Sequence, residues 1–383
     1  MAHILLVDDE PSVTSALRRS LRVLRADWTV HTATSGADAL ELMDTQHFDV
    51  IVSDMRMPQM DGATLLAHVR ERHPGTVRLI LSGHTAHESL MRSVGPAHQF
   101  LAKPCEPAVL SSTIERMLDL RARLHDDRMI PILGGVQSLP KRPLIFEELI
   151  DALAEPSTPF AKTADIIQSD IALTAEVLRL ANSPYFGHTG TIDSVDRAIA
   201  CVGLETLHSV VLGAHTFQIV GEPSGIDLDR IWQHSLRVAT MMRAIATLER
   251  WTPNETAQAF LCGLLHAVGL LFLAAAQPTT FAAHHRPSGP GSTDHETNHF
   301  GCTQFEAGAY LLGLWGFPFA IIEAIAAQPA TDDAIPLAYA LTIANIAAAG
   351  HNSQTTHADG RTPTEQHAHW QTECVRVGGE SPS

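Results

Sequence analysis

The sequence predicts two domains: an α/β doubly wound, flavodoxin-like domain with a five-stranded parallel sheet, followed by an all-α helical domain. The chain has 383 residues, more than one ordinary domain needs. Up to about Arg121, short β-rich runs alternate with helical patterns. From Leu144 to about Ala349 nearly every periodic segment is helical. Alternation of the first kind is typical of a parallel sheet with helices on both faces.

The first domain begins with a strand-like run and repeats the strand and helix pattern to its end. The five expected strands are HILLV, TVHTA, VIVS, VRLIL and QFLA. Helix periodicity is clearest after the last strand, where Leu110, Ile114, Met117 and Leu118 share one face. The first domain is therefore expected to end with an amphipathic helix.

Polar side chains stand at the ends of the expected strands. They are Asp8, Asp9, Asp54, Ser82 and Lys103. The carboxyl ends of parallel strands lie along one edge, so these side chains should converge. Clustered carboxylates repel one another unless a hard cation such as Mg²⁺ neutralises them. Asp54 could then act as a carboxylate nucleophile toward a phosphoryl donor, with Ser82 and Lys103 contacting the phosphoryl oxygens.

The segments VDDEPSV, SDMRMPQMDG, LSGH and FLAKP resemble the four signatures of response-regulator receiver domains, over residues 1–122. The resemblance implies that a sensor histidine kinase phosphorylates Asp54. It implies that Asp8, Asp9, Asp54 and the backbone carbonyl of Arg56 hold Mg²⁺. It also places Phe100 at an aromatic switch position, and it makes the face of the fourth helix, fifth strand and fifth helix a candidate homodimer surface.

Residues 123–138 are expected to form a helical extension and linker. The charged segment RARLHDDRMI should extend the last helix of the first domain, and the breaker-rich PILGGVQSLPKRP follows it.

Residues 139–349 resemble the HDOD family, on the segments SLPKRPLIFEEL, SDIALTAEVLRLANSPYFG, SVDRAIACVGLETL, IWQHS, FLCGLLHAVG and FEAGAYLLGLWGFP. The resemblance implies an all-α, HD-like helical output domain that recruits an unidentified signalling protein.

The metal site of true HD phosphohydrolases is degenerate in this sequence. By resemblance, His234 and His266 are retained, whereas Ala267 and Asn345 replace the two expected aspartates. Gln304 and Gln328 stand roughly where cyclic-dinucleotide phosphodiesterases would supply further histidines. Two imidazoles without a carboxylate suit hard metals poorly, so a noncatalytic domain is expected. A metal-dependent phosphohydrolase acting on a nucleotide or cyclic dinucleotide is the alternative.

His295-Glu296-Thr297-Asn298-His299 spells HExxH, the zinc-protease pattern. A loop is expected here, because HHRPSGPGSTD precedes the motif and Thr297 and Asn298 are poor helix formers. A protease is therefore not expected.

Residues 350–383 contain no Leu, Ile, Met or Phe and are expected to be a disordered tail, with His367, His369 and Cys374 in solvent.

Charge and cysteine usage narrow the remaining classes. Through Ala122 there are 12 basic and 15 acidic residues, which leaves 14 and 27 for the rest of the chain. So acidic an output domain is not expected to bind nucleic acid. Five widely spaced cysteines, and no recognisable export signal, favour the cytoplasm. The apolar stretch Ala259–Ala276 has His266 near its middle, so we expect a buried core helix and not a membrane span.

Overall fold

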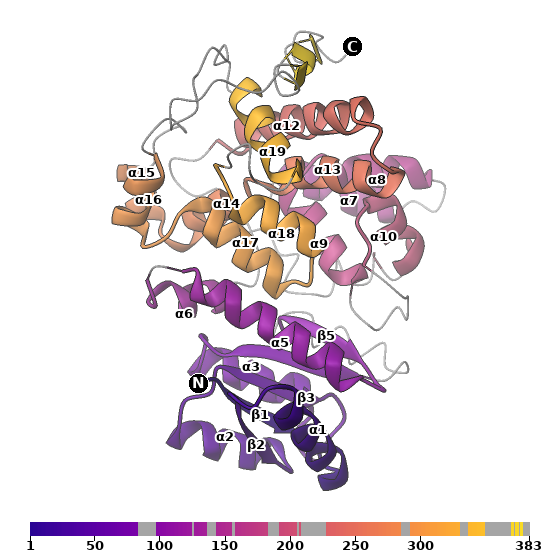
Figure 1. Cartoon of the computed structure of the whole chain (residues 1–383). Helices are drawn as coiled ribbons and strands as arrows, with labels where there is room; N and C mark the ends of the chain where they lie inside the picture. The colour runs from indigo at the N-terminus through magenta and orange to yellow at the C-terminus, as the bar shows by residue number, and fades with distance from the viewer. Residues whose placement is uncertain are drawn as a thin grey trace.

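The structure is a computed structural model (Figure 1). It describes residues 1–82, 97–124, 126–135, 143–154, 158–182, 191–204, 207, 227–284, 292–329, 336–348, 369–370, 372–374 and 376–377. Residues 83–96, which contain the expected fourth helix of the first domain, lie outside the described residues.

The first domain is built on a five-stranded parallel sheet. Its strands are β1 (His3–Val7), β2 (Thr29–Ala33), β3 (Val50–Asp54), β4 (Val77–Ser82) and β5 (Gln99–Ala102). Their order across the sheet is β2-β1-β3-β4-β5, and every neighbouring pair is parallel. The predicted doubly wound, flavodoxin-like fold is confirmed.

Helices cover both faces of this sheet. They are α1 (Pro11–Leu24), α2 (Gly36–Thr45), α3 (Gly62–Arg72) and α5 (Pro107–Ala122). Side chains alternate along β1, so Leu5 faces the core under α2 and α3, whereas Leu6 faces the core under α1 and α5. Both leucines are fully buried, as expected for strands of an all-parallel sheet.

The linker does not extend α5 as one continuous helix. α5 ends at Ala122, and a separate helix α6 (Met129–Gly135) follows it. Between these two helices, the carboxylate of Asp126 accepts a hydrogen bond from the backbone N–H of Arg128. Met129, Ile130 and Leu133 of α6 are buried. The expected single extended helix is therefore wrong, and α6 is instead packed into the molecule.

The second domain is helical throughout the part that the structure describes. Its helices are α7 (Pro143–Ala154), α8 (Phe160–Gln168), α9 (Ile171–Ala181), α10 (Val195–Val202), α12 (Leu228–Leu248), α13 (Pro253–Leu265), α14 (Val268–Ala276), α15 (Pro278–His284), α16 (Ser292–Phe300), α17 (Gln304–Leu314), α18 (Phe319–Ala326) and α19 (Pro336–Ala348). Capping boxes, Thr252 with Glu255 and Thr303 with Glu306, begin α13 and α17.

The stretch Pro253–Ala276 is long and apolar enough to cross a membrane by length and composition alone. Its most apolar window is 78% buried inside the protein, and the chain turns at His266 and Ala267, between α13 and α14. The stretch thus forms two successive helices of the domain core.

Part of the C-terminal segment packs onto the second domain. The Trp370 side chain is 3% exposed, and its indole N–H donates to Glu249 at 2.7 Å. Cys374 is fully buried. For these residues the expectation of a solvated tail is wrong, because one large aromatic ring supplies the apolar surface that Leu, Ile, Met and Phe would otherwise provide. His367 lies outside the described residues, and His369 is exposed.

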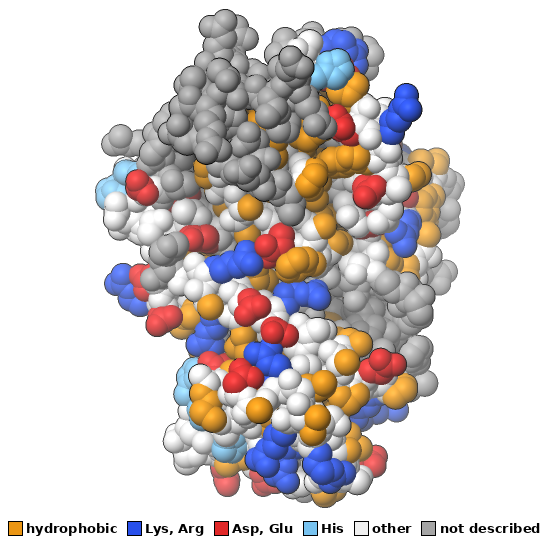
Figure 2. All heavy atoms as spheres, viewed as in Figure 1, with side chains coloured by type: hydrophobic (Ala, Val, Ile, Leu, Met, Phe, Trp, Pro, Cys, Tyr) orange, Lys and Arg blue, Asp and Glu red, His pale blue; other side chains and the backbone are white. Residues whose placement is uncertain are grey.

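The two domains meet along α5, β5 and α17 (Figure 1). Figure 2 shows charged and hydrophobic side chains interspersed along this boundary. Arg123, just after α5, pairs with Glu323 of α18 at 2.9 Å, and the guanidinium of Arg116 lies 5.6 Å from the ring centroid of Phe319. The buried core on the α1 and α5 side of the sheet continues into the second domain. The boundary is therefore a packed interface.

Candidate phosphorylation site and a degenerate histidine site

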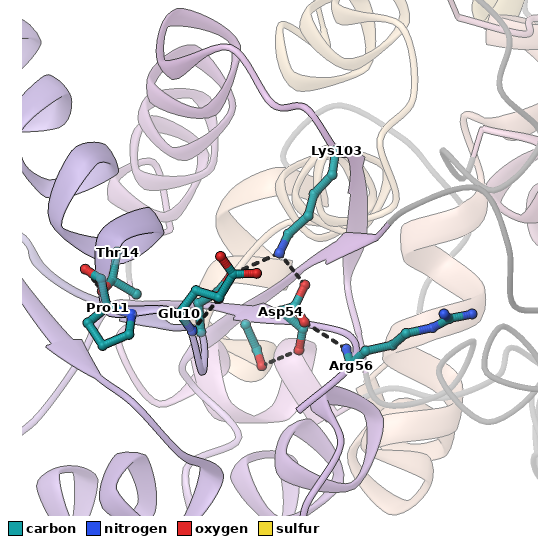
Figure 3. Close-up of polar contacts among 8 residues, drawn as sticks. Glu10, Pro11, Thr14, Asp54, Arg56 and Lys103 are labelled. Carbon is teal, nitrogen blue, oxygen red and sulfur yellow. Dashed lines mark hydrogen bonds and ion pairs between the residues drawn. The ribbon is translucent and has the colours of Figure 1, made fainter. Parts of the chain in front are cut away.

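The carboxyl ends of the strands bring three charged side chains together, as Figure 3 shows for Asp54 and Lys103. Asp8 directly follows β1, Asp54 is the last residue of β3, and Lys103 directly follows β5. The Lys103 ammonium lies 2.8 Å from a carboxylate oxygen of Asp8 and also pairs with Asp54. Two acids from different strands thus converge on one cation, as the strand-end pattern predicted.

Backbone groups fix the orientation of both carboxylates. The N–H of Arg56 donates to Asp54 at 2.8 Å, and the N–H of Glu10 donates to Asp8 at 2.9 Å (Figure 3). Gly62 approaches the backbone of Asp54 so closely that a Cβ at this position would overlap the Asp54 carbonyl oxygen. The loop after β3 therefore requires glycine at position 62.

Burial alters the electrostatics of this cluster. Asp8 and Asp54 are 4% and 7% exposed, whereas Asp9 is exposed. Burial lowers the pKa of Lys103, but the hydrogen bonds and charges of Asp54 and Asp8 outweigh it, so the pKa is raised overall. Lys103 therefore stays cationic and balances two carboxylates that would otherwise repel each other.

The carboxylates also fit a divalent cation. Asp8 and Asp54 both direct an oxygen toward the Lys103 ammonium, and carboxylate oxygens of this kind are the donors that Mg²⁺ prefers. Of the other predicted residues, Phe100 in β5 is half-buried and packs against the core under α2 and α3. The backbone of Ser82 ends β4, but its side chain lies outside the described residues.

The positions of the degenerate HD site also meet in space. His234 of α12 lies 2.7 Å from the Asn345 side-chain oxygen in α19, measured from Nε2. The ring centroids of His234 and His266 are 5.4 Å apart. Ala267 follows His266 directly and is buried, with no donor atom to offer a metal. Sequence reasoning thus found one spatial cluster across more than a hundred residues.

Burial keeps this histidine pair neutral. It lowers the pKa of His266 to about 3, with the neighbouring His234 contributing in the same direction. Burial also lowers the pKa of His234, against the opposing effect of its hydrogen bond to Asn345. The Nδ1 of His266 donates to the Gly263 carbonyl at 2.6 Å, because a carbonyl oxygen can only accept. These histidines therefore have partners within the protein.

Gln304 and Gln328 are also engaged in packing contacts. The side-chain amide of Gln304 donates to Glu296 at 3.0 Å. The amide of Gln328 donates to the Ala324 and Ala338 carbonyls, and its oxygen accepts from Thr342 at 2.8 Å. Their hydrogen bonds thus fasten helices to one another.

The HExxH segment is helical, so the expectation of a loop there is wrong. It lies in α16. Glu296 is 6% exposed, and it accepts hydrogen bonds from both the backbone N–H and the side-chain amide of Gln304. These contacts, together with the burial of Phe300 at the helix end, outweigh the poor helix propensities of Thr297 and Asn298.

Sequence reasoning missed a buried cation that holds the linker. Arg78 in β4 is 1% exposed, and its guanidinium donates to the carbonyl oxygen of Gly134 in α6 at 2.6 Å. His98 lies 3.0 Å from the same oxygen. An arginine inside a buried parallel strand was the available signal, since such strands are otherwise almost continuously apolar.

Comparison with known proteins agrees with this architecture. Residues 4–115 match the response regulator receiver domain, and residues 139–331 match the HDOD domain. The MmoQ response regulator from Methylococcus capsulatus is 27% identical, with a TM-score of 0.50, over 64% of this chain and 99% of that one. The fold and the strand-end site define the class of response regulators, which act in phosphorelay signalling. The chain belongs to the HDOD family and carries an N-terminal receiver domain.

Curated relatives share a smaller part of the chain. The transcriptional regulatory protein GlrR of Escherichia coli is 37% identical over 131 residues, which is 33% of this chain and 28% of GlrR. The sensor kinase CckA of Brucella abortus is 39% identical over 123 residues, 31% of this chain and 13% of CckA. The chain thus spans less than a third of the length of each of these two relatives.

Proposed function

We propose that this protein is a cytoplasmic response regulator in which a sensor histidine kinase phosphorylates Asp54, and that the HDOD domain transmits this signal through protein contacts. The observation that carries the proposal is the convergence of Asp8, Asp54 and Lys103 at one sheet edge. A carboxylate oxygen of Asp54 attacks the phosphorus of the donor phosphohistidine, the phosphorus-nitrogen bond breaks, and an acyl phosphate forms.

Asp8, Asp9, Asp54 and the backbone carbonyl of Arg56 would hold Mg²⁺, which neutralises negative charge as the phosphoryl group approaches. Lys103 would exchange its contact with the free Asp54 carboxylate for one with the phosphoryl oxygens, and Ser82 would donate a second. Each charge-assisted contact is worth about 1.5–3 kcal/mol. Two of them approach the roughly 5.5 kcal/mol that moves an equilibrium from 1:99 to 99:1.

The route to the output domain begins at β5. Gln99 in this strand donates a hydrogen bond to Gly313 of α17, Phe100 follows it, and Lys103 stands just after the strand. We infer that rearrangement of Lys103 and Phe100 changes the contact of β5 and α5 with α17. The same contact covers part of the candidate homodimer face, so dimerisation through that face would require α17 to move away.

The HDOD domain is proposed to be noncatalytic and to recruit an unidentified signalling protein. His266 is buried, His234 is bonded to Asn345, and Ala267 offers no carboxylate. The phosphohydrolase alternative predicts metal-dependent turnover of a nucleotide or cyclic dinucleotide that is lost in His234→Ala. Such turnover by the full-length chain would overturn the noncatalytic assignment.

The phosphorylation proposal is tested with a small phosphodonor, acetyl phosphate, and Mg²⁺. Phosphoprotein is separated on a phosphate-affinity gel, and hydrogen exchange of α5 and α17 is measured before and after treatment. We expect Asp54→Asn to lose both the shifted band and the exchange change. Asp44→Asn, an exposed carboxylate of the same domain, should behave as the unmodified chain does. Equal labelling of Asp54→Asn would refute Asp54 as acceptor, and unchanged exchange after full labelling would refute the route through α17.

A further inference from the structure

Three histidines gather where α15 and α16 lie side by side, outside the sites described above. His284 ends α15, and His295 and His299 belong to α16. Each offers a ring nitrogen, and these three nitrogens all lie within 4.8 Å of one another. Figure 2 shows histidine side chains at the surface in the region that Figure 1 assigns to these helices. The cluster is therefore open to solvent on one side.

Helix geometry accounts for two members of this cluster. His295 and His299 are four residues apart in α16, so they share one face of the helix, and their ring centroids are 4.3 Å apart. His284 adds a third ring from the neighbouring helix, 3.9 Å from the His299 ring centroid and nearly parallel to it. Three imidazoles from two helices are thus held together.

We propose that His284, His295 and His299 bind one late first-row divalent transition metal ion, such as Zn²⁺. Neutral imidazoles suit ions of this class, and a Zn–N bond of about 2.0–2.1 Å places tetrahedral ligand nitrogens about 3.3 Å apart. Rotation of the side chains closes the present spread of 4.8 Å to that value, and His299 is exposed to solvent. The fourth position is open to water.

A hydrogen bond already orients one of the ligands. The Nε2 of His295 lies 2.8 Å from the carbonyl oxygen of His284. Because a carbonyl can only accept, Nε2 carries the proton and Nδ1 keeps its lone pair for the metal. The contact also ties the ligand on α16 to the backbone of α15.

The site binds a metal without the catalytic group of a zinc protease. Glu296 belongs to the same helix but is buried, and both of its carboxylate oxygens accept hydrogen bonds from Gln304. It is therefore held in the protein interior and cannot serve as the base that such a protease needs. The site accordingly has no general base of that kind.

The position of the site gives the metal a structural role. Gln277, the residue directly after α14, donates to the Phe300 carbonyl at the end of α16, and it also contacts the Met129 sulfur in α6. Through Gln277, the pair of helices α15 and α16 is therefore connected to the linker helix α6. A metal ion that joins the two helices would stiffen this support.

The test uses the full-length chain without a polyhistidine tag, stripped of metal and held in excess Mg²⁺ to occupy the receiver site. Zn²⁺ is titrated by calorimetry. We expect one equivalent to bind and the melting temperature to rise with Zn²⁺. His295→Ala and His299→Ala should weaken this binding tenfold or more, and both should lose the rise in melting temperature.

Three matched histidine variants separate this site from others. His47→Ala removes an exposed receiver histidine, His234→Ala removes the degenerate HD site, and His369→Ala removes a C-terminal histidine. Each should retain the Zn²⁺ equivalent. Absence of binding in the unmodified chain, or its full retention in both His295→Ala and His299→Ala, would overturn the proposal. Circular dichroism establishes that the variants are folded, and because His299 is exposed, His299→Ala remains informative if His295→Ala fails to fold.

Discussion

The side-chain amide of Gln99 in β5 donates a hydrogen bond to the carbonyl oxygen of Gly313 in α17, at 2.5 Å. These residues lie 214 positions apart in the chain. A Cβ at Gly313 would overlap the Leu120 side chain of α5, so the absence of a side chain at position 313 lets α17 approach both β5 and α5 closely. The strand that leads to Lys103 is thus fastened directly to the output domain.

The ion pair between Arg123 and Glu323 should contribute to this closed arrangement. Its side chains are 47% and 24% exposed, so the pair is expected to contribute about 0.2–1 kcal/mol. Loss of the pair alone should therefore shift the ratio of molecules with separated domains to molecules with packed domains by no more than about fivefold. Arg123→Glu, which also adds repulsion from Glu323, should shift this ratio further, as measured by energy transfer between dyes on the two domains at low salt. The double variant Arg123→Glu with Glu323→Arg should restore the closed population.

Arg128→Glu is the matched control for this charge reversal. Arg128 is 88% exposed and pairs with Asp126 inside the linker, so the same change of charge there should leave the energy transfer nearly unchanged. If Arg128→Glu opened the molecule as much as Arg123→Glu, net charge would be the cause and the specific pair would not.

Buried His266 should make the stability depend on pH. Its pKa is lowered from 6.5 to about 3, so the unfolded chain binds a proton below pH 6.5 that the folded protein does not bind. Its contribution is fully present above pH 6.5 and is lost as the pH falls toward 3, at roughly 1.4 kcal/mol per pH unit. Urea unfolding of the unmodified chain and of His266→Gln between pH 7 and pH 5 measures the difference.

We expect the free energy of unfolding to fall less steeply with acidification in His266→Gln than in the unmodified chain. His47→Gln, which replaces an exposed histidine, should keep the original slope. Parallel pH profiles for His266→Gln and the unmodified chain would mean that His266 is protonated in the folded protein and is therefore not shielded from solvent.

The contact of α14 with α17 should not tolerate a side chain at Gly269. A Cβ there would overlap the Gln304 carbonyl oxygen and lie 2.6 Å from the backbone nitrogen of Gly308. These are backbone atoms, so the helices themselves must separate. Overpacking typically costs about 1–3 kcal/mol, and Gly269→Ala should lower the free energy of unfolding in urea by at least that amount.

Gly135 in α6 provides the comparison for Gly269. Outside its own helix and chain neighbours, the nearest heavy atom to a Cβ at position 135 is the Pro74 Cβ, 4.0 Å away, so Gly135→Ala should change the free energy of unfolding by no more than about 0.5 kcal/mol. Equal losses in the two variants would contradict the close approach of α14 and α17.

The geometry of the candidate phosphorylation site was largely predictable because it is local to strand ends. Asp8, Asp54 and Lys103 each end or follow an apolar run, and parallel strands bring such positions to one edge whatever the details of packing. The predictions of a loop at the HExxH segment and of a solvated tail at Trp370 are wrong for the opposite reason. Helix propensity and composition are weak signals, and burial of Glu296, Phe300 and Trp370 against distant helices outweighed them.

The sequence by itself determined the two fold classes and the convergence of side chains at Asp54. It also determined the family resemblance that groups His234, His266 and Asn345 into one degenerate site. Only the tertiary structure decided that α17 covers β5 and α5, that Arg78 holds the linker helix, and that His284 joins His295 and His299. The physical reason is the distance along the chain over which each kind of interaction acts. Periodicity and strand-end chemistry act over a few residues, whereas these contacts join segments that meet only after whole helices have packed.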